Sequence, residues 1–167
     1  MSRKVYLFFL VFCWVFAAMA QGPGPDTGNP LPDSSKITLL KLVNAARTRG
    51  YRCGNQQMPP VAPLEWNDLL QDAATQHSRD MSAHNFLSHT GSDGSKFSAR
   101  ITRSGYTWNR CGENIAHGYP NERQVVEGWL KSPDHCKNIM NREFQSMGVA
   151  RSGLYWTQDF GSQPPQK

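Results

Sequence analysis

Three ionisable side chains, in three separate segments, constrain the fold and the function of this chain more than any other feature. His89 lies in the segment FLSHT, Glu113 in GENIA and His135 in SPDH. Imidazole and carboxylate groups bind divalent metals and move protons near neutral pH. Because the three segments are far apart in the sequence, only a fold that brings them together could use them as one site.

The N-terminus is typical of a secretory signal peptide over residues 1–20. Two basic residues, Arg3 and Lys4, precede an apolar run, and Ala18-Met19-Ala20 fits a signal-peptidase site. The run is shorter than the roughly 20 residues that cross a bilayer, although an uncleaved anchor is the alternative. No later stretch is apolar enough to span a membrane. We therefore predict an extracellular, secreted protein.

Charge and length narrow the class of protein further. Loss of Arg3 and Lys4 with the signal peptide lowers the formal net charge from +5 to +3. The remaining Lys and Arg residues are scattered, which argues against a nucleic-acid partner. The rest of the chain is long enough for one domain with a substantial core, which we expect to act as a monomer.

Hydrophobic periodicity predicts an α+β protein with helices on both sides of a small antiparallel sheet. We expect a Gly/Pro-rich leader over 21–35 and a loop over 52–63. Aromatic residues on inward faces should pack in the core, whereas Tyr106, Trp108 and Tyr119 should lie on exposed loops near Glu113. The predicted helices span 33–49, 67–84, a short turn ending at 105, 122–131 and 133–141, and the predicted strands span 114–116, 147–150 and 154–160.

The three motifs resemble the CAP superfamily, which includes cysteine-rich secretory proteins, antigen 5 and pathogenesis-related-one proteins, and they resemble its bacterial-type subgroup most. The resemblance implies a three-layer α-β-α sandwich of the CAP/SCP type over 36–162, followed by a tail at 163–167. In the family, two His and two acidic residues line a cleft. His89, Glu113 and His135 match three of them, but Ser132 stands where plant and animal relatives carry the second Glu.

The resemblance also bears on the cysteines that would remain after signal cleavage. Cys53-Gly54 and His135-Cys136 match positions at which many bacterial-type sequences carry cysteine. This favours a Cys53–Cys136 disulfide with Cys111 free. A Cys111–Cys136 disulfide remains the competing pairing, because both residues flank the proposed site.

The residues leave several functions open. The trio could hold zinc, with Glu113 and the two histidines around the ion, or it could be a proton-bridged network that only braces the cleft. His77 lies on the apolar face of the predicted 67–84 helix and is expected to be a core residue. Ser88 and Ser132 lie beside the histidines, but no Gly-x-Ser-x-Gly motif accompanies them.

We therefore expect a secreted, non-enzymatic binding module. Its cleft would hold a divalent metal or a small sterol-like, lipid or glycan-like ligand, in a role that could include defence. The alternative is a metal-assisted extracellular hydrolase of peptides or cell-wall material. In that alternative Glu113 would be the general base, and His89 and His135 would be the metal ligands.

Overall fold

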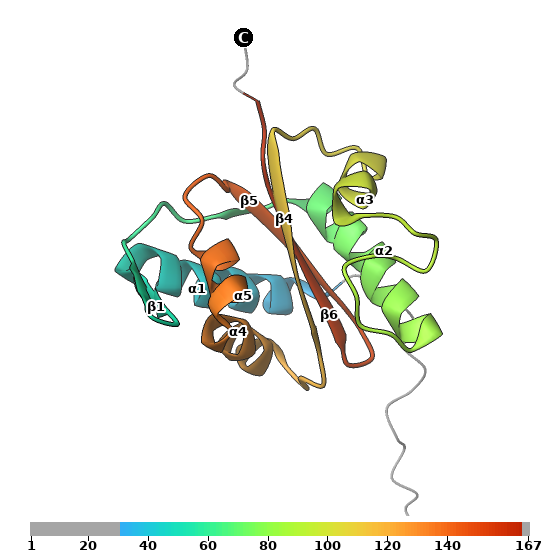
Figure 1. Cartoon of the computed structure of the whole chain (residues 1–167), viewed down its shortest axis with the longest axis horizontal. Coiled ribbons are helices and arrows are strands. Elements are labelled where there is room, and N and C mark those ends of the chain that lie inside the picture. Colours follow the sequence, from blue (N-terminus) through green and yellow to red (C-terminus); the bar gives the residue numbers. More distant parts are fainter. Residues whose placement is uncertain (1–30, 165–167) are drawn as a thin grey trace, which may run out of the picture.

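The computed structural model describes residues 31–164, so the predicted signal peptide and nearly all of the leader lie outside the described residues. Within this range no helix is long and apolar enough to cross a bilayer. The chain forms five helices and six strands in the described range (Figure 1). Their order is α1 Asp33–Arg49, β1 Tyr51–Cys53, β2 Gln56–Met58, β3 Glu65–Trp66, α2 Asp68–His84, α3 Phe97–Arg103, β4 Arg110–His117, α4 Glu122–Lys131, α5 Pro133–Ile139, β5 Ser146–Ser152 and β6 Tyr155–Ser162.

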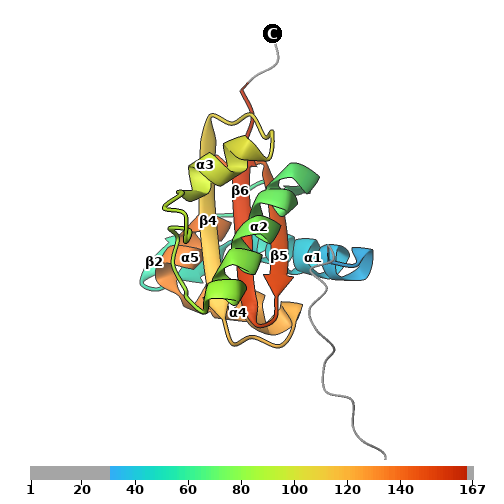
Figure 2. The ribbon, with the colours of Figure 1, turned by 90° about the vertical axis from the view of Figure 1, so that its right-hand side faces the viewer.

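A four-stranded sheet lies at the centre, with the strand order β3-β5-β6-β4. Strand β6 pairs antiparallel with both β5 and β4, and the short β3 runs parallel to β5. Helices α2 and α3 cover one face of the sheet (Figure 2), and α1, α4 and α5 lie on the other side. The predicted layers, with helices on both sides of a sheet, are therefore present.

Helix α2 is the main cover of the first face. Asn67 caps its start by accepting the backbone N–H groups of Leu69 and Leu70. The helix crosses β5 at Gly148, where an added Cβ would lie 2.1 Å from the backbone N of Gln71. Only glycine permits this close approach. Leu69, predicted to lie on the buried stripe, is instead 38% exposed, because the first turn directs Leu70 rather than Leu69 at the sheet.

The central strand β6 is more buried than its sequence suggests. The alternation of Trp156 and Phe160 with Tyr155, Thr157 and Asp159 predicts a half-buried strand. In the structure Tyr155 is half-buried, but Thr157 and Asp159 are as fully buried as Trp156 and Phe160. The prediction was wrong because β6 lies between two other strands and carries helices on both faces.

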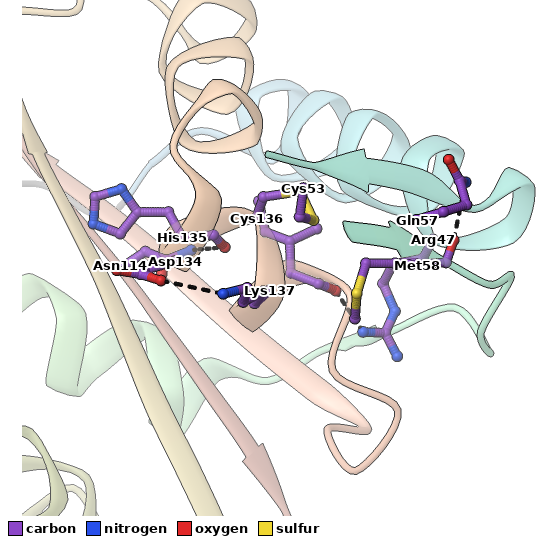
Figure 3. Close-up of a disulfide and its surroundings, with 10 residues drawn as sticks. Arg47, Cys53, Gln57, Met58, Asn114, Asp134, His135, Cys136 and Lys137 are labelled. Carbon is purple, nitrogen blue, oxygen red and sulfur yellow. Dashed lines mark hydrogen bonds and ion pairs between the residues drawn. A yellow bond between two sulfur atoms is a disulfide. The ribbon is translucent and has the colours of Figure 1, made fainter. Parts of the chain in front are cut away.

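The segment predicted as a loop over 52–63 contains the small antiparallel hairpin of β1 and β2. Gly50 ends α1 with a φ of +75°, a conformation that other residues rarely adopt. Cys53, at the end of β1, forms a disulfide with Cys136 of α5 (Figure 3). The pairing favoured from the resemblance is thus confirmed. Cys111 is free, and burial raises the pKa of its thiol to about 11.

Arg47 links α1 by hydrogen bonds to the segment before β3 and to the segment between α5 and β5. Its side chain is fully buried, and its guanidinium donates to the backbone carbonyls of Ala62, Ile139, Asn141 and Phe144 at 2.6–3.2 Å. Burial lowers the pKa of Arg47 to about 10. This one side chain therefore serves carbonyl groups from the loop before β3, from the end of α5 and from the loop after α5.

Strand β4 is an edge strand, and side chains from α4 and α5 cover its outer carbonyls. Trp129 Nε1 donates to the carbonyl of Ile115, and Asn138 Nδ2 donates to the carbonyl of Glu113. These bonds block addition of another strand at this edge. They also place α5, with His135, beside the part of β4 that carries Glu113.

Candidate functional site

Glu113 is the centre of the predicted site, and its side chain is buried on β4. Its Oε1 accepts a hydrogen bond from His89 Nδ1 at 2.7 Å. Its Oε2 accepts one from Arg100 Nη2, also at 2.7 Å. Both carboxylate oxygens therefore have a charge-assisted partner, and the Arg100 guanidinium balances the buried negative charge.

His89 lies in the loop between α2 and α3, and its side chain is 51% exposed. Because Nδ1 donates to Glu113, the neutral ring carries its lone pair on Nε2. The backbone carbonyls of His89 and of the preceding residue, Ser88, each accept a hydrogen bond from a buried side chain. Arg100 Nη2 bonds to the carbonyl of His89 at 3.1 Å, and His77 Nε2 bonds to the carbonyl of Ser88 at 2.8 Å.

His135 approaches from the other side of β4, on the first turn of α5. Its backbone carbonyl accepts a hydrogen bond from Asn114 Nδ2, and Asn114 directly follows Glu113 in the strand. Its imidazole points away from the Cys53–Cys136 disulfide (Figure 3). Burial is the main cause that lowers the pKa of His135, and a proton on His89 would lower it further.

The structure therefore places His89 in direct contact with Glu113, and the main chain of His135 in contact with Asn114, the next residue of β4. Ser132 lies at the junction of α4 and α5, half-buried, and its side chain does not cap α5. Ser88 Oγ accepts the backbone N–H of Thr90, a local turn contact. The roles of all these residues as a binding site stay predictions.

Three further residues of the cluster were not predicted as site residues. Arg100 is only 3% exposed on α3, and its spacing of three from Phe97 was the one sequence signal that it faces inward. His77 is buried as predicted, but its Nε2 also lies 3.9 Å from Glu113 Oε2. Burial is the main cause that lowers the pKa of His77.

Asp159 is the third of these residues. It pairs directly with Glu113 in the β4–β6 register and is fully buried. Neither of its carboxyl oxygens has a hydrogen-bond partner among residues 31–164. Burial, and next the charge of Glu113, raise the pKa of Asp159 well above the ordinary value of 3.8, while Arg100 opposes this change. Nothing in the local sequence around Asp159 predicts this pairing.

The aromatic residues predicted to lie on exposed loops near Glu113 are more buried than expected. Tyr106, predicted on an exposed loop, is 1% exposed because its ring packs against Gly161 of β6. Trp108 and Tyr119 are half-buried. In the described part of the chain, no group of three or more His, Cys, Asp or Glu side chains is arranged to hold a metal ion.

Comparison with known proteins identifies the family. The model of the CAP family, described as the cysteine-rich secretory protein family, matches residues 40–160. The chain belongs to the CAP family. Its CAP domain is 34% identical over 127 residues to the uncharacterized membrane protein YlbC of Bacillus subtilis (strain 168), and 34% identical over 125 residues to the uncharacterized protein YkwD of the same organism. These matches cover 76% and 73% of this chain but only 34% and 45% of the two relatives.

Two solved structures with similar folds come from bacteria. An extracellular protein from Bacillus anthracis that contains an SCP domain superposes with a TM-score of 0.67 and 29% identity, over 81% of this chain and 45% of that chain. An outer surface protein of Borrelia burgdorferi gives a TM-score of 0.66 at 21% identity, over 78% of this chain and 94% of that chain. The second likeness concerns the fold alone. The expected α-β-α sandwich of the CAP/SCP type is thus confirmed.

Proposed function

We propose that this CAP domain is an extracellular, non-enzymatic binding module that holds a zinc ion between His89 and His135. The observation that carries the proposal is the 2.7 Å hydrogen bond from His89 Nδ1 to Glu113 Oε1. A carboxylate that accepts a hydrogen bond from the N–H of one ring nitrogen leaves the other nitrogen with a lone pair that can bind a metal. Nε2 of His89, on a half-exposed side chain, has this character.

The donor set fits zinc only in part. The two imidazoles are suitable ligands, and the ion would supply Lewis acidity and open positions for a ligand. Glu113 does not fit as a third ligand, because His89 and Arg100 occupy its two oxygens. We therefore assign Glu113 the orientation of His89 rather than metal ligation, which differs from the arrangement expected from the sequence.

The same contacts favour binding over hydrolysis. A general base must reach the proton that it removes from water or substrate. Glu113 is buried, and its two carboxylate oxygens already accept hydrogen bonds from His89 and Arg100. A hydrolase that used Glu113 as its base would first have to break one of these bonds.

Three observations support an extracellular location. The N-terminal residues have the pattern of a signal peptide, and a disulfide indicates an oxidising compartment. The similar Bacillus anthracis protein is described as extracellular. The relative YlbC is described as a membrane protein, and attachment of this chain to a membrane would be tested by fractionating cells that express it.

Calorimetry with zinc chloride tests the proposed site. We expect saturable binding at pH 7.5, weaker binding at pH 5, and loss of binding in His89→Ala and in His135→Ala. Acid weakens binding because a proton and the metal compete for the same imidazole lone pair. His84→Ala is the matched control, since His84 is exposed on α2 and bonds to Asp80. Equal binding at both pH values, or in all three variants, would contradict the proposal.

A second candidate function rests on a different observation. An apolar groove of about 440 Å³ lies between α1 and α4, with Arg49 and Arg123 among its lining residues. Its size and lining suit a small apolar ligand, such as a sterol or a fatty acid, with a negative end. Its apolar lining includes Leu42, Ala45, Tyr51, Val126 and Leu130.

Displacement of a fluorescent fatty acid tests this groove separately. We expect Ala45→Trp to abolish binding by filling the groove, and His89→Ala to leave it unchanged. Loss of binding in His89→Ala with retention in Ala45→Trp would place the ligand at the His89 side of the sheet instead.

A further inference from the structure

One buried guanidinium contacts both the group that orients the His89 ring and the main chain that carries it. Arg100 Nη2 donates to Glu113 Oε2 at 2.7 Å and to the carbonyl of His89 at 3.1 Å. Arg100 Nη1 donates to the carbonyl of Ser95 at 2.9 Å. The side chain of Arg100 is 4% exposed, so these bonds form away from water.

These contacts fix the geometry between His89 and Glu113. The loop that carries His89 joins α2 to α3 and contains no regular secondary structure from residue 86 to residue 96. Arg100 holds this loop at residue 89 and again at residue 95. Since the same guanidinium also holds Glu113, it sets the distance between the carboxylate and the His89 ring.

The planar shape of the guanidinium matters here. Its N–H groups point in fixed directions within one plane, so one side chain can serve Glu113 on β4 and two carbonyl groups of the α2–α3 loop. A lysine ammonium is a compact point charge and could not keep all of these contacts. His77 assists from α2, by bonding to the carbonyl of Ser88 at 2.8 Å.

We propose that Arg100 is a positioning residue for His89. It holds the main chain of His89 and the carboxylate of Glu113 so that Nδ1 of the ring stays the donor and Nε2 stays available on the exposed side. This inference deepens the zinc-binding function proposed above and depends on it only for the affinity measurement. It assigns a role to a residue outside the His89, Glu113 and His135 trio.

The first experiment uses the wild-type protein without metal. The ¹⁵N shifts of the imidazole nitrogens report which one carries the proton. We expect His89 to be a single Nδ1–H tautomer at pH 8. A His89 ring that carries its proton on Nε2 would overturn the inference, whatever the behaviour of any variant.

The second experiment compares Arg100→Gln with Arg103→Gln. Arg103 lies on the same helix but is exposed and pairs with Asp93 at the surface, so it is the matched control. We expect Arg100→Gln to shift His89 to a mixture of tautomers and to weaken zinc binding by about 10–100-fold, the range for loss of a residue that orients a metal ligand. Arg103→Gln should change neither.

A folded Arg100→Gln protein that keeps the pure Nδ1–H tautomer of His89 would overturn the inference. If Arg100→Gln does not fold, Arg100→Lys is judged by the same criterion. Absence of zinc binding in the wild type would refute the proposed metal site, while the tautomer comparison would still decide the role of Arg100.

Discussion

Glu113 and Asp159 face each other on paired positions of β4 and β6, so two carboxyl groups share one buried region with a single guanidinium. Arg100 bonds to Glu113, and Asp159 has no hydrogen-bond partner within residues 31–164. A buried carboxyl without a partner favours its neutral form. The two carboxyl groups therefore differ: Glu113 accepts hydrogen bonds from His89 and Arg100, whereas Asp159 keeps its proton to a higher pH than an ordinary aspartate.

Asp159→Asn should make the stability less dependent on pH. Because the pKa of Asp159 is raised on folding, its contribution to stability is fully present below about pH 4 and is lost as the pH rises through the folded-state pKa. The loss can reach about 1.4 kcal/mol per pH unit between the two pKa values. Urea unfolding from pH 4 to pH 8 should show a smaller decline for Asp159→Asn than for the wild type. The exposed Asp72→Asn on α2 should match the wild type, and an equal decline in all three proteins would contradict this account.

His77→Gln should protect the protein from mild acid. Burial lowers the pKa of His77 below 6.5, so the unfolded chain takes up a proton first as the pH falls. The stability contributed by neutral His77 is present above about pH 6.5 and is lost below it, by at most about 2 kcal/mol at pH 5. Glutamine can still donate to the carbonyl of Ser88, so the variant should lose less stability between pH 7 and pH 5. His84→Gln, on the exposed side of α2, is the control and should lose as much as the wild type.

Arg47→Lys should destabilise the fold strongly. An ammonium cannot reach the four carbonyl oxygens that the buried guanidinium serves, and each carbonyl left without a donor is costly. We expect a loss of about 3 kcal/mol in the free energy of unfolding. Arg49→Lys is the control, since Arg49 is exposed and donates to the carbonyl of Ala45 in its own helix. Similar stabilities of the two variants would show that the Arg47 contacts contribute little.

Ser132→Glu should tighten zinc binding without loss of stability. Position 132 directly precedes α5, which carries His135, and Ser132 makes no side-chain cap there. An acidic side chain at a helix start is worth roughly 0.3–1 kcal/mol, and no cap bond is lost in exchange. A carboxylate near the two imidazoles would add charge and a possible ligand oxygen. If the zinc affinity of Ser132→Glu equals that of the wild type while His135→Ala abolishes binding, position 132 does not face the metal.

The local sequence was sufficient for the elements whose pattern is strong. Helix α2 has an apolar stripe, a capping Asn67 and a clear end, and it forms where predicted. The Cys53–Cys136 disulfide followed from the resemblance to a family, because spacing alone left another pairing open. The hairpin of β1 and β2 was missed, since three prolines downstream of Arg52 suggested an irregular loop.

The local sequence pattern did not predict the burial of β6. Alternating apolar and polar residues normally indicate a strand with one face exposed to solvent. Thr157 and Asp159 are buried because helices far away in the sequence cover both faces of the sheet. The environment of a strand residue depends on its position in the sheet, which the strand's own sequence does not encode.

The sequence by itself determined the family, the layered α+β architecture and the identity of His89, Glu113 and His135 as candidate residues. Only the tertiary structure decided how they are arranged. It pairs Glu113 with Arg100 and His89, so that each of its carboxylate oxygens accepts a hydrogen bond. It also sets Asp159 opposite Glu113 across two strands. The physical reason is that charge balance in a buried region depends on which side chains meet in space, and these residues come from α3, β4, β6 and a loop.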